Sequence, residues 1–182
     1  MRGRRRTCVW GLALVAGALV GAPAQATVSG EAELFTIARS QNRNLVQYAV
    51  HLDAACVPVA GAPVYAYWRM LERGPTSTAP LLPHEERAYG LASQQVVSPT
   101  TAGAAGAVRV VLRAVPSRPL LVETWRAGDG ACRVLTTVQI AGAPAHLGSV
   151  YVRLKSPIRV DYLLLQGWSL DGTRRVEEKL GA

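Results

Sequence analysis

The stretch CRVLTTVQIAGAPAHLGSVYVRLK, Cys132 to Lys155, indicates most clearly which fold this chain adopts. Its first part, Cys132 to Ile140, places an apolar or small residue at every second position, and so does its last part, Ser149 to Lys155. Side chains of a β-strand point alternately to opposite faces, whereas this spacing would scatter apolar residues around a helix. Both parts are therefore predicted to be strands with one buried face.

Similar stretches lie on either side of this one and predict further strands. They are Leu34–Arg39, Leu45–Leu52, Val64–Leu71, Tyr89–Val97, Val108–Ala114, Leu120–Arg126, Tyr162–Leu170 and Arg174–Lys179. About ten short strands at this spacing are typical of an all-β domain, either a single antiparallel β-sandwich or an up-and-down barrel.

Turn residues separate the predicted strands. Asn42–Asn44, Gly128–Gly130 and Asp171-Gly172 are hairpin signals, because Asn, Asp and Gly accept positive φ angles. The segment Gly74–Arg87 contains three prolines and is expected to be an excursion without a strand. One short helical turn is expected near residues 83–88, where a proline precedes two acidic residues.

The first 26 residues resemble a targeting signal. Four arginines precede an apolar stretch of only 15 residues, Cys8 to Ala22, and small residues occupy Ala24 and Ala26. Because about 20 apolar residues are needed to cross a bilayer, a secretory signal peptide over residues 1–26 is predicted rather than an anchor. Residues 27–182 are then expected to form a single all-β domain, exported to the periplasm or the extracellular space.

Composition and charge exclude some classes of protein and partner. The chain has 182 residues, of which 49% are hydrophobic, and this excludes a mostly disordered protein. The four arginines of the signal supply half of the formal charge of +8. The remaining charge is spread over many strands, so no nucleic-acid partner is expected. No later stretch is long and apolar enough to predict a transmembrane segment in the mature chain.

Two cysteines remain after the signal, Cys56 and Cys132. In an oxidising compartment such a pair most often forms a disulfide, whereas the alternative is two separate buried thiols. If neighbouring strands all pair antiparallel, successive connections lie at alternate ends of the domain. Cys56 lies in the second connection and Cys132 at the end of the sixth, so both would lie at the same end. A disulfide between them is therefore predicted.

No catalytic signature appears in the sequence. The three histidines lack a second ligand at metal-binding spacing, and no phosphate loop, nucleophile elbow or dinucleotide motif occurs. We therefore expect no metal and no cofactor.

The densest polar and aromatic segments suggest a ligand cleft instead. The candidate ligand-binding residues are Arg39, Asn42, Asn44, Tyr48, Tyr67, Glu86 and Tyr89. The alternative is structural: the asparagines would form turns, Trp68 would be a buried core residue, and Glu85 would stabilise the start of a helix. By the same reasoning, the first and third connections share the other end of the domain. Asn42, Asn44 and Glu86 are therefore predicted to approach one another there.

These segments resemble a bacterial domain-of-unknown-function family, number 4833. The resemblance lies in Phe35 to Ser40, Asn42, Asn44, Tyr48, Pro63-Val64, Tyr67-Trp68, Glu86 and Ala88 to Leu91. It implies an exported protein of unassigned activity, and it supplies no catalytic residues.

Three hypotheses for the function follow. The first is a non-enzymatic secreted module that binds a small ligand or an envelope protein. The second is a hydrolase that uses Glu85 or Glu86 as acid or base, with Arg39 and Tyr48 orienting the substrate. The third is a structural protein of the cell envelope whose edge strands associate with others.

Overall fold

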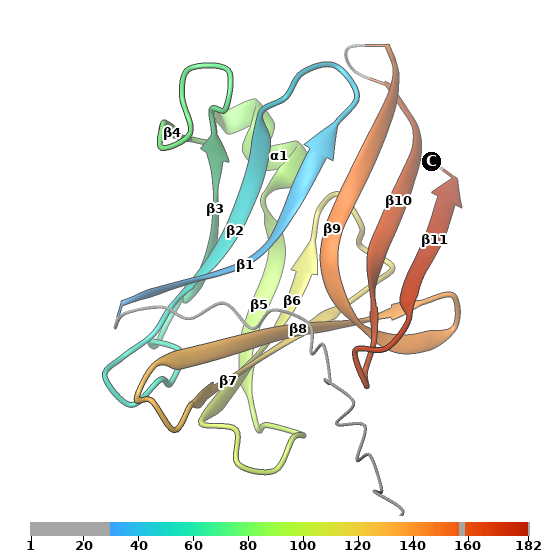
Figure 1. Ribbon diagram of the computed structural model, residues 1–182. Coiled ribbons are helices and arrows are strands. Elements are labelled where there is room, and N and C mark those ends of the chain that lie inside the picture. Colours follow the sequence, from blue (N-terminus) through green and yellow to red (C-terminus); the bar gives the residue numbers. More distant parts are fainter. Residues whose placement is uncertain (1–29, 157–158, 182) are drawn as a thin grey trace, which may run out of the picture.

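A computed structural model of the chain describes residues 30–156 and 159–181 (Figure 1). The predicted signal peptide, residues 1–26, lies outside the described residues. The described chain contains eleven strands and one helix. These are β1 (Glu31–Arg39), β2 (Leu45–His51), β3 (Val64–Arg69), β4 (Thr78–Pro80), α1 (Pro83–Tyr89), β5 (Leu91–Val97), β6 (Gly106–Leu112), β7 (Leu120–Arg126), β8 (Cys132–Ile140), β9 (Ala143–Ser156), β10 (Arg159–Ser169) and β11 (Arg175–Gly181).

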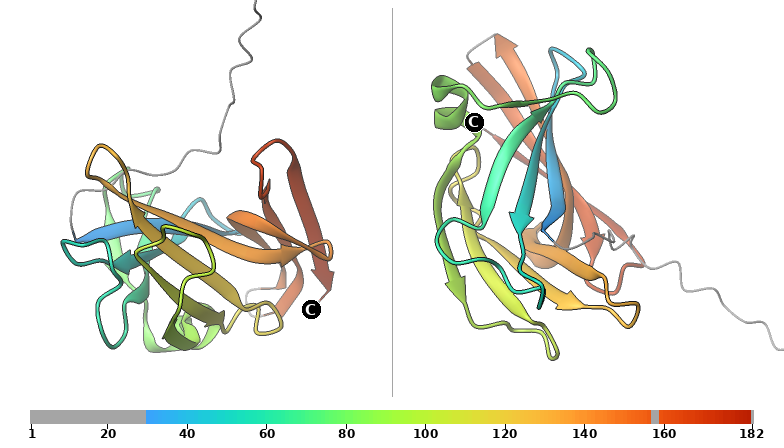
Figure 2. Two further views of the ribbon diagram at one scale, coloured as in Figure 1. Left: turned by 90° about the horizontal axis from the view of Figure 1, so that it is seen from below. Right: turned by 90° about the vertical axis from the view of Figure 1, so that its left-hand side faces the viewer.

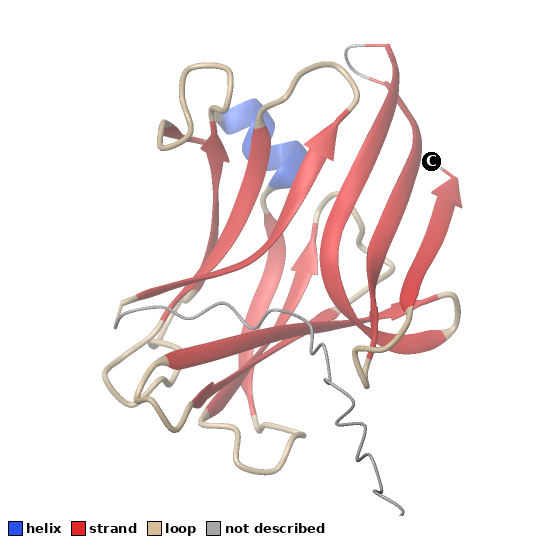
Figure 3. Cartoon of the chain, in the orientation of Figure 1, coloured by secondary structure: helices blue, strands red, loops and turns tan. Residues whose placement is uncertain are grey.

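All eleven strands belong to one mixed sheet (Figure 3). The main path runs β4-β3-β2-β1-β9-β8-β7-β6-β5, and β10 with β11 branches from β9. The all-β class is confirmed. The sheet differs from the predicted antiparallel sandwich or up-and-down barrel, because β1 pairs in parallel with β9 and the sheet is not closed.

Strand β9 explains this topology. It has 14 residues, and its first four, Ala143–His146, pair with β8. Its later residues Ser149–Val152 pair with β1 on one side, and β10 follows it along most of its length. One long strand thus joins the part of the sheet that contains β1–β4 to the part that contains β5–β8.

The sheet curves so that these two parts face each other across the core (Figure 2). The inward residues of each strand alternate with outward ones, as the sequence predicted. The fully buried large side chains come from both parts and include Tyr48, Ile37, Val46 and Val50 as well as Leu112, Val108, Val110 and Val122.

The edges of β3 and β5 lie beside each other, although no backbone ladder joins them. The side-chain amide of Gln94 on β5 donates to the carbonyl oxygen of Val64 at 3.0 Å, and its oxygen accepts the Val64 N–H at 2.9 Å. The Gln94 side chain therefore satisfies the backbone N–H and C=O groups of Val64, which a neighbouring strand would otherwise bond.

Two local predictions have different outcomes. The helical turn near residues 83–88 is confirmed as α1, which begins at Pro83 and has Glu85 and Glu86 in its first turn. The segment Gly74–Arg87 was expected to contain no strand, and this is wrong for Thr78–Pro80, which pairs with Tyr67–Arg69. These three residues, which include Pro80, form a strand here because an edge strand pairs on one side only.

The predicted disulfide is confirmed. Cys56, in the connection between β2 and β3, is bonded to Cys132 at the first position of β8, with 5.4 Å between their Cα atoms. The bond ties the two facing parts of the sheet together at one end.

Within the described ranges, no helix is both long and apolar enough to cross a membrane.

Candidate functional site

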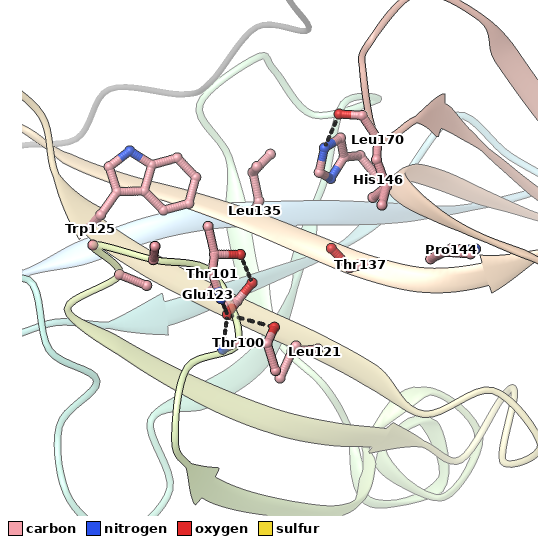
Figure 4. A pocket seen from close by; sticks show the side chains of 13 residues that line it. Thr100, Thr101, Leu121, Glu123, Trp125, Leu135, Thr137, Pro144, His146 and Leu170 are labelled. Carbon is pink, nitrogen blue, oxygen red and sulfur yellow. Dashed lines mark hydrogen bonds between the residues drawn. The ribbon is translucent and has the colours of Figure 1, made fainter.

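A pocket of about 640 Å³ lies on the outward face of β7, β8 and the start of β9, and the loop of residues 98–105 borders it. We call it the outer pocket. It is lined by Thr100, Thr101, Ala102, Gly103, Ala104, Leu121, Glu123, Trp125, Leu135, Thr137, Pro144, His146 and Leu170. Figure 4 shows Trp125 at one end and His146 with Leu170 at the other.

Strand alternation brings these side chains to the outward face. On β7, the inward residues Leu120 and Val122 are buried in the core, so that the alternate residues Leu121 and Glu123 point outward. Leu121 pairs with Thr137 on β8, and Thr137 pairs with His146 on β9. Residues opposite each other in a ladder share a face, so the register places these three side chains in one row across the pocket.

Glu123 connects the loop of residues 98–105 to the sheet. Its carboxylate accepts the N–H groups of Thr100 and Thr101, at 2.6 and 2.8 Å, and the hydroxyl groups of the same residues, at 3.0 and 2.7 Å (Figure 4). Glu123 is only 6% exposed. Burial disfavours the charged form, but the hydrogen bonds from Thr101 and Thr100 outweigh it and lower the pKa of Glu123 below its ordinary value.

Replacing Glu123 with Gln is expected to lower the free energy of unfolding by about 2 kcal/mol at pH 7, because hydrogen bonds to a charged acceptor are lost. A carboxyl whose pKa is lowered by folding stabilises the protein above its unfolded pKa and loses this effect as the pH falls through the folded pKa. The difference between parent and variant should therefore shrink below about pH 4.

Urea unfolding of both proteins between pH 3 and 7 would measure this difference. Glu177→Gln is the matched control, because Glu177 forms an exposed ion pair with Arg175 and should change stability by less than about 0.5 kcal/mol. A loss for Glu123→Gln that does not depend on pH would contradict the explanation.

His146 and Leu170 form one end of the pocket. The Nε2 atom of His146 lies 3.1 Å from the carbonyl oxygen of Leu170. A carbonyl oxygen only accepts, so Nε2 carries the proton in this contact. Gly167 permits the close approach of β10 to β9, since a Cβ atom there would lie 2.1 Å from the carbonyl oxygen of His146.

Four of the candidate ligand-binding residues predicted from the sequence come together at α1: Arg39, Tyr48, Glu86 and Tyr89. The Tyr48 hydroxyl donates to the carbonyl oxygen of Tyr89, and the Arg39 guanidinium lies 4.5 Å from the ring centre of Trp68 and 5.8 Å from that of Tyr89. Burial, followed by the proximity of Tyr89 and Glu86, raises the pKa of the Tyr48 hydroxyl. Tyr48 and Tyr89 are both buried, so this cluster contributes to packing whether or not it also binds a ligand.

In the predicted group of Asn42, Asn44 and Glu86, a hydrogen bond joins the two asparagines, but among the described residues none joins either of them to Glu86. The loops that carry them do lie at the same end of the sheet (Figure 1). However, the Asn44 side chain bonds Glu72, accepting its N–H at 3.2 Å and donating to its carboxylate at 3.5 Å. The Asn42 side chain accepts the Asn44 N–H, as expected of a turn.

Tyr67 lies away from the other candidates, on the outward face of β3. Its ring centre is 5.9 Å from that of Tyr65, which in turn stacks on His51 at 4.3 Å. Tyr67 therefore cannot contact the same small ligand as the inward-facing Tyr48. The ligand-binding role of the seven residues stays a prediction, but their positions divide them among three places.

One of the two carboxylates that the hydrolase hypothesis offers as acid or base, that of Glu85, is largely occupied. One oxygen of Glu85 accepts the Trp68 Nε1–H at 2.8 Å and the Leu82 N–H at 2.8 Å. These contacts secure the start of α1 and match the structural alternative for Glu85.

Sequence reasoning missed the outer pocket, although one signal was present. The segment LLVETWR, Leu120–Arg126, carries large apolar residues on both faces of the strand, at Leu120 and Val122 and also at Leu121 and Trp125. Such a strand is covered on both sides. The loop of residues 98–105 supplies the outer cover.

The part of the chain that the structure describes contains no group of three or more His, Cys, Asp or Glu residues that could hold a metal ion.

A family model described as a domain of unknown function, DUF4833, matches residues 35–179. This match agrees with the resemblance seen in the sequence. No curated protein and no solved structure matches the chain.

Proposed function

This chain belongs to the DUF4833 family, and we propose that it is a non-enzymatic binding module that takes a small, largely apolar ligand into the outer pocket. The observation that carries the proposal is the pocket itself. Its volume of about 640 Å³ is typical of small-molecule sites, and its walls combine apolar side chains such as Leu121, Leu135 and Trp125 with a few polar groups. Leu170, at one end of the pocket, is 51% exposed, and a ligand would cover part of this apolar surface.

The bonding of the polar groups supports binding rather than catalysis. A general base must lie within hydrogen-bond reach of the group that it activates. In the outer pocket the Glu123 carboxylate is occupied by four hydrogen bonds that hold Thr100 and Thr101, and His146 bonds a backbone carbonyl group. These polar groups stabilise the walls of the pocket.

We further propose that the protein acts outside the cytoplasm, in the periplasm or beyond the cell. The signal predicted over residues 1–26 supports export. The Cys56–Cys132 disulfide supports it as well, because such bonds persist mainly in oxidising compartments.

Filling the pocket tests the binding function. The variant Leu135→Trp adds a large side chain to the middle of the outer pocket. It should raise the Kd for Nile red, an uncharged apolar dye, by about tenfold or more, equivalent to about 1.4 kcal/mol, because the ring occupies the volume that the dye needs. Fluorescence titration of the exported protein would measure the Kd.

Val96→Trp is the matched control. Val96 is exposed on the edge strand β5 and does not line the outer pocket, so this variant should bind the dye as the parent does. If the parent does not bind the dye, or if Leu135→Trp binds it equally well, the proposal is wrong.

A further inference from the structure

A second, smaller hollow adjoins the outer pocket. We call it the side hollow; its volume is about 200 Å³, and it shares Thr100, Leu121, Thr137 and Pro144 with the outer pocket. Because one set of side chains borders both hollows, a single elongated molecule could occupy both. The side hollow adds one charged residue, Arg109.

Arg109 is positioned by the sheet. It lies on β6 and pairs with Leu121 on β7, which places it next to the row of Leu121, Thr137 and His146. Its side chain is exposed. Among residues 30–156 and 159–181 it has neither an ion-pair partner nor a side-chain hydrogen bond.

The two hollows together hold one satisfied and one unsatisfied charge. The negative charge of Glu123 is compensated by four donors from Thr100 and Thr101. The positive charge of Arg109 has no such compensation in the described chain. A guanidinium group binds carboxylate and phosphate oxygens with paired, charge-assisted hydrogen bonds. An anionic group in the side hollow would therefore be favoured.

We propose that the ligand is an anionic amphiphile. Its apolar chain lies in the outer pocket between Leu135 and Trp125, and its carboxylate or phosphate group binds Arg109 in the side hollow. This inference rests on the proposed function, since it assigns the chemistry of the ligand at the same site. It adds the sign of the ligand's charge, the amphiphilic character of the ligand and its orientation across the two hollows.

Three probes with the same ten-carbon chain test the charge. Decanoate, decanol and decylamine would each be used, below the concentration of micelle formation, to displace Nile red from the exported protein at pH 7.5. Decanoate should bind about tenfold more tightly than decanol, equivalent to about 1.4 kcal/mol, because its carboxylate accepts charge-assisted hydrogen bonds from Arg109. Decylamine should bind most weakly of the three.

Arg109→Gln should remove the preference for decanoate over decanol and leave decanol binding unchanged. The matched control is Arg113→Gln, because Arg113 is also exposed and follows the same strand but lines neither hollow. This control should keep the preference. Melting temperatures of both variants would show that they are folded.

The outcomes separate the two proposals. If Nile red binds and all three probes displace it equally, or decylamine displaces it best, the anionic ligand is wrong while the binding function stands. If decanoate is preferred by the parent and equally by Arg109→Gln, the placement of the head group is wrong. If neither the dye nor any probe binds, the binding function fails, and the inference fails with it.

Discussion

Replacing Cys56 and Cys132 together with alanine is expected to lower the free energy of unfolding by about 4 kcal/mol. The two cysteines are 76 residues apart, and a crosslink over a loop of this length removes much of the conformational entropy of the unfolded chain. Both side chains are buried in the core cluster, so the replacement also removes packed sulfur atoms. The effect should be large because the bond joins the β2–β3 connection to β8, across the two facing parts of the sheet.

Urea unfolding under non-reducing conditions would measure this loss. Dithiothreitol should destabilise the parent by a similar amount and should not change the double variant, which separates the effect of the bond from that of the lost side-chain volume. A loss below about 1 kcal/mol, or two free thiols in a peptide map of the parent purified without reductant, would contradict the prediction.

Replacing Trp68 with alanine is expected to lower the free energy of unfolding by roughly 3–5 kcal/mol, because it leaves a large cavity. Trp68 is 4% exposed and packs edge-to-face against Tyr89, with 6.1 Å between ring centres. Its indole N–H donates to Glu85, and Arg39 stacks on its ring. The ring therefore links β3 to α1 and to the end of β1.

Trp168→Ala is the matched control for this substitution. Trp168 is 40% exposed at the outward face of β10, so its removal should cost less than about 1 kcal/mol. Trp68→Phe should lie between the two, because it keeps part of the ring volume and loses the hydrogen bond to Glu85. Denaturant titration of all three variants would rank them. A loss below about 1 kcal/mol for Trp68→Ala would show that the site is hydrated rather than packed.

Several features of the fold were predictable because they depend on neighbouring residues alone. The three hairpin signals, Asn42–Asn44, Gly128–Gly130 and Asp171-Gly172, each connect the strands expected. In the last of them Gly172 has a φ of 71°, and hydrogen bonds from Ser169 and Thr173 lower the pKa of Asp171 to about 2. The hydrogen bonds of such turns join residues only two or three positions apart, so the sequence is enough to predict them.

The candidate site was predicted less well, and the reason lies in the range of its contacts. Asn44 and Glu86 were expected to meet because their loops lie at one end, yet the side chain of Asn44 bonds Glu72, 28 residues away. Loop length and strand order can place two side chains at the same end of the sheet. They do not determine which residue each side chain bonds. For the same reason the sequence did not reveal the outer pocket. Its carboxylate, that of Glu123, bonds Thr100 and Thr101, which lie 23 and 22 residues earlier in the chain.

Patterns in the sequence were enough to predict that the chain forms strands, which residues of most strands point to the core, where several hairpins turn, and that Cys56 and Cys132 form a disulfide. Alternation and turn propensity are local, and two cysteines allow one disulfide. Two features became visible only in the folded chain: the parallel pairing of β1 with β9, and the loop of residues 98–105 that turns the outward face of β7 and β8 into a pocket. These features bring together residues far apart in the chain. Such contacts depend on the entropy of closing long loops and on the final strand register, and no local pattern records either.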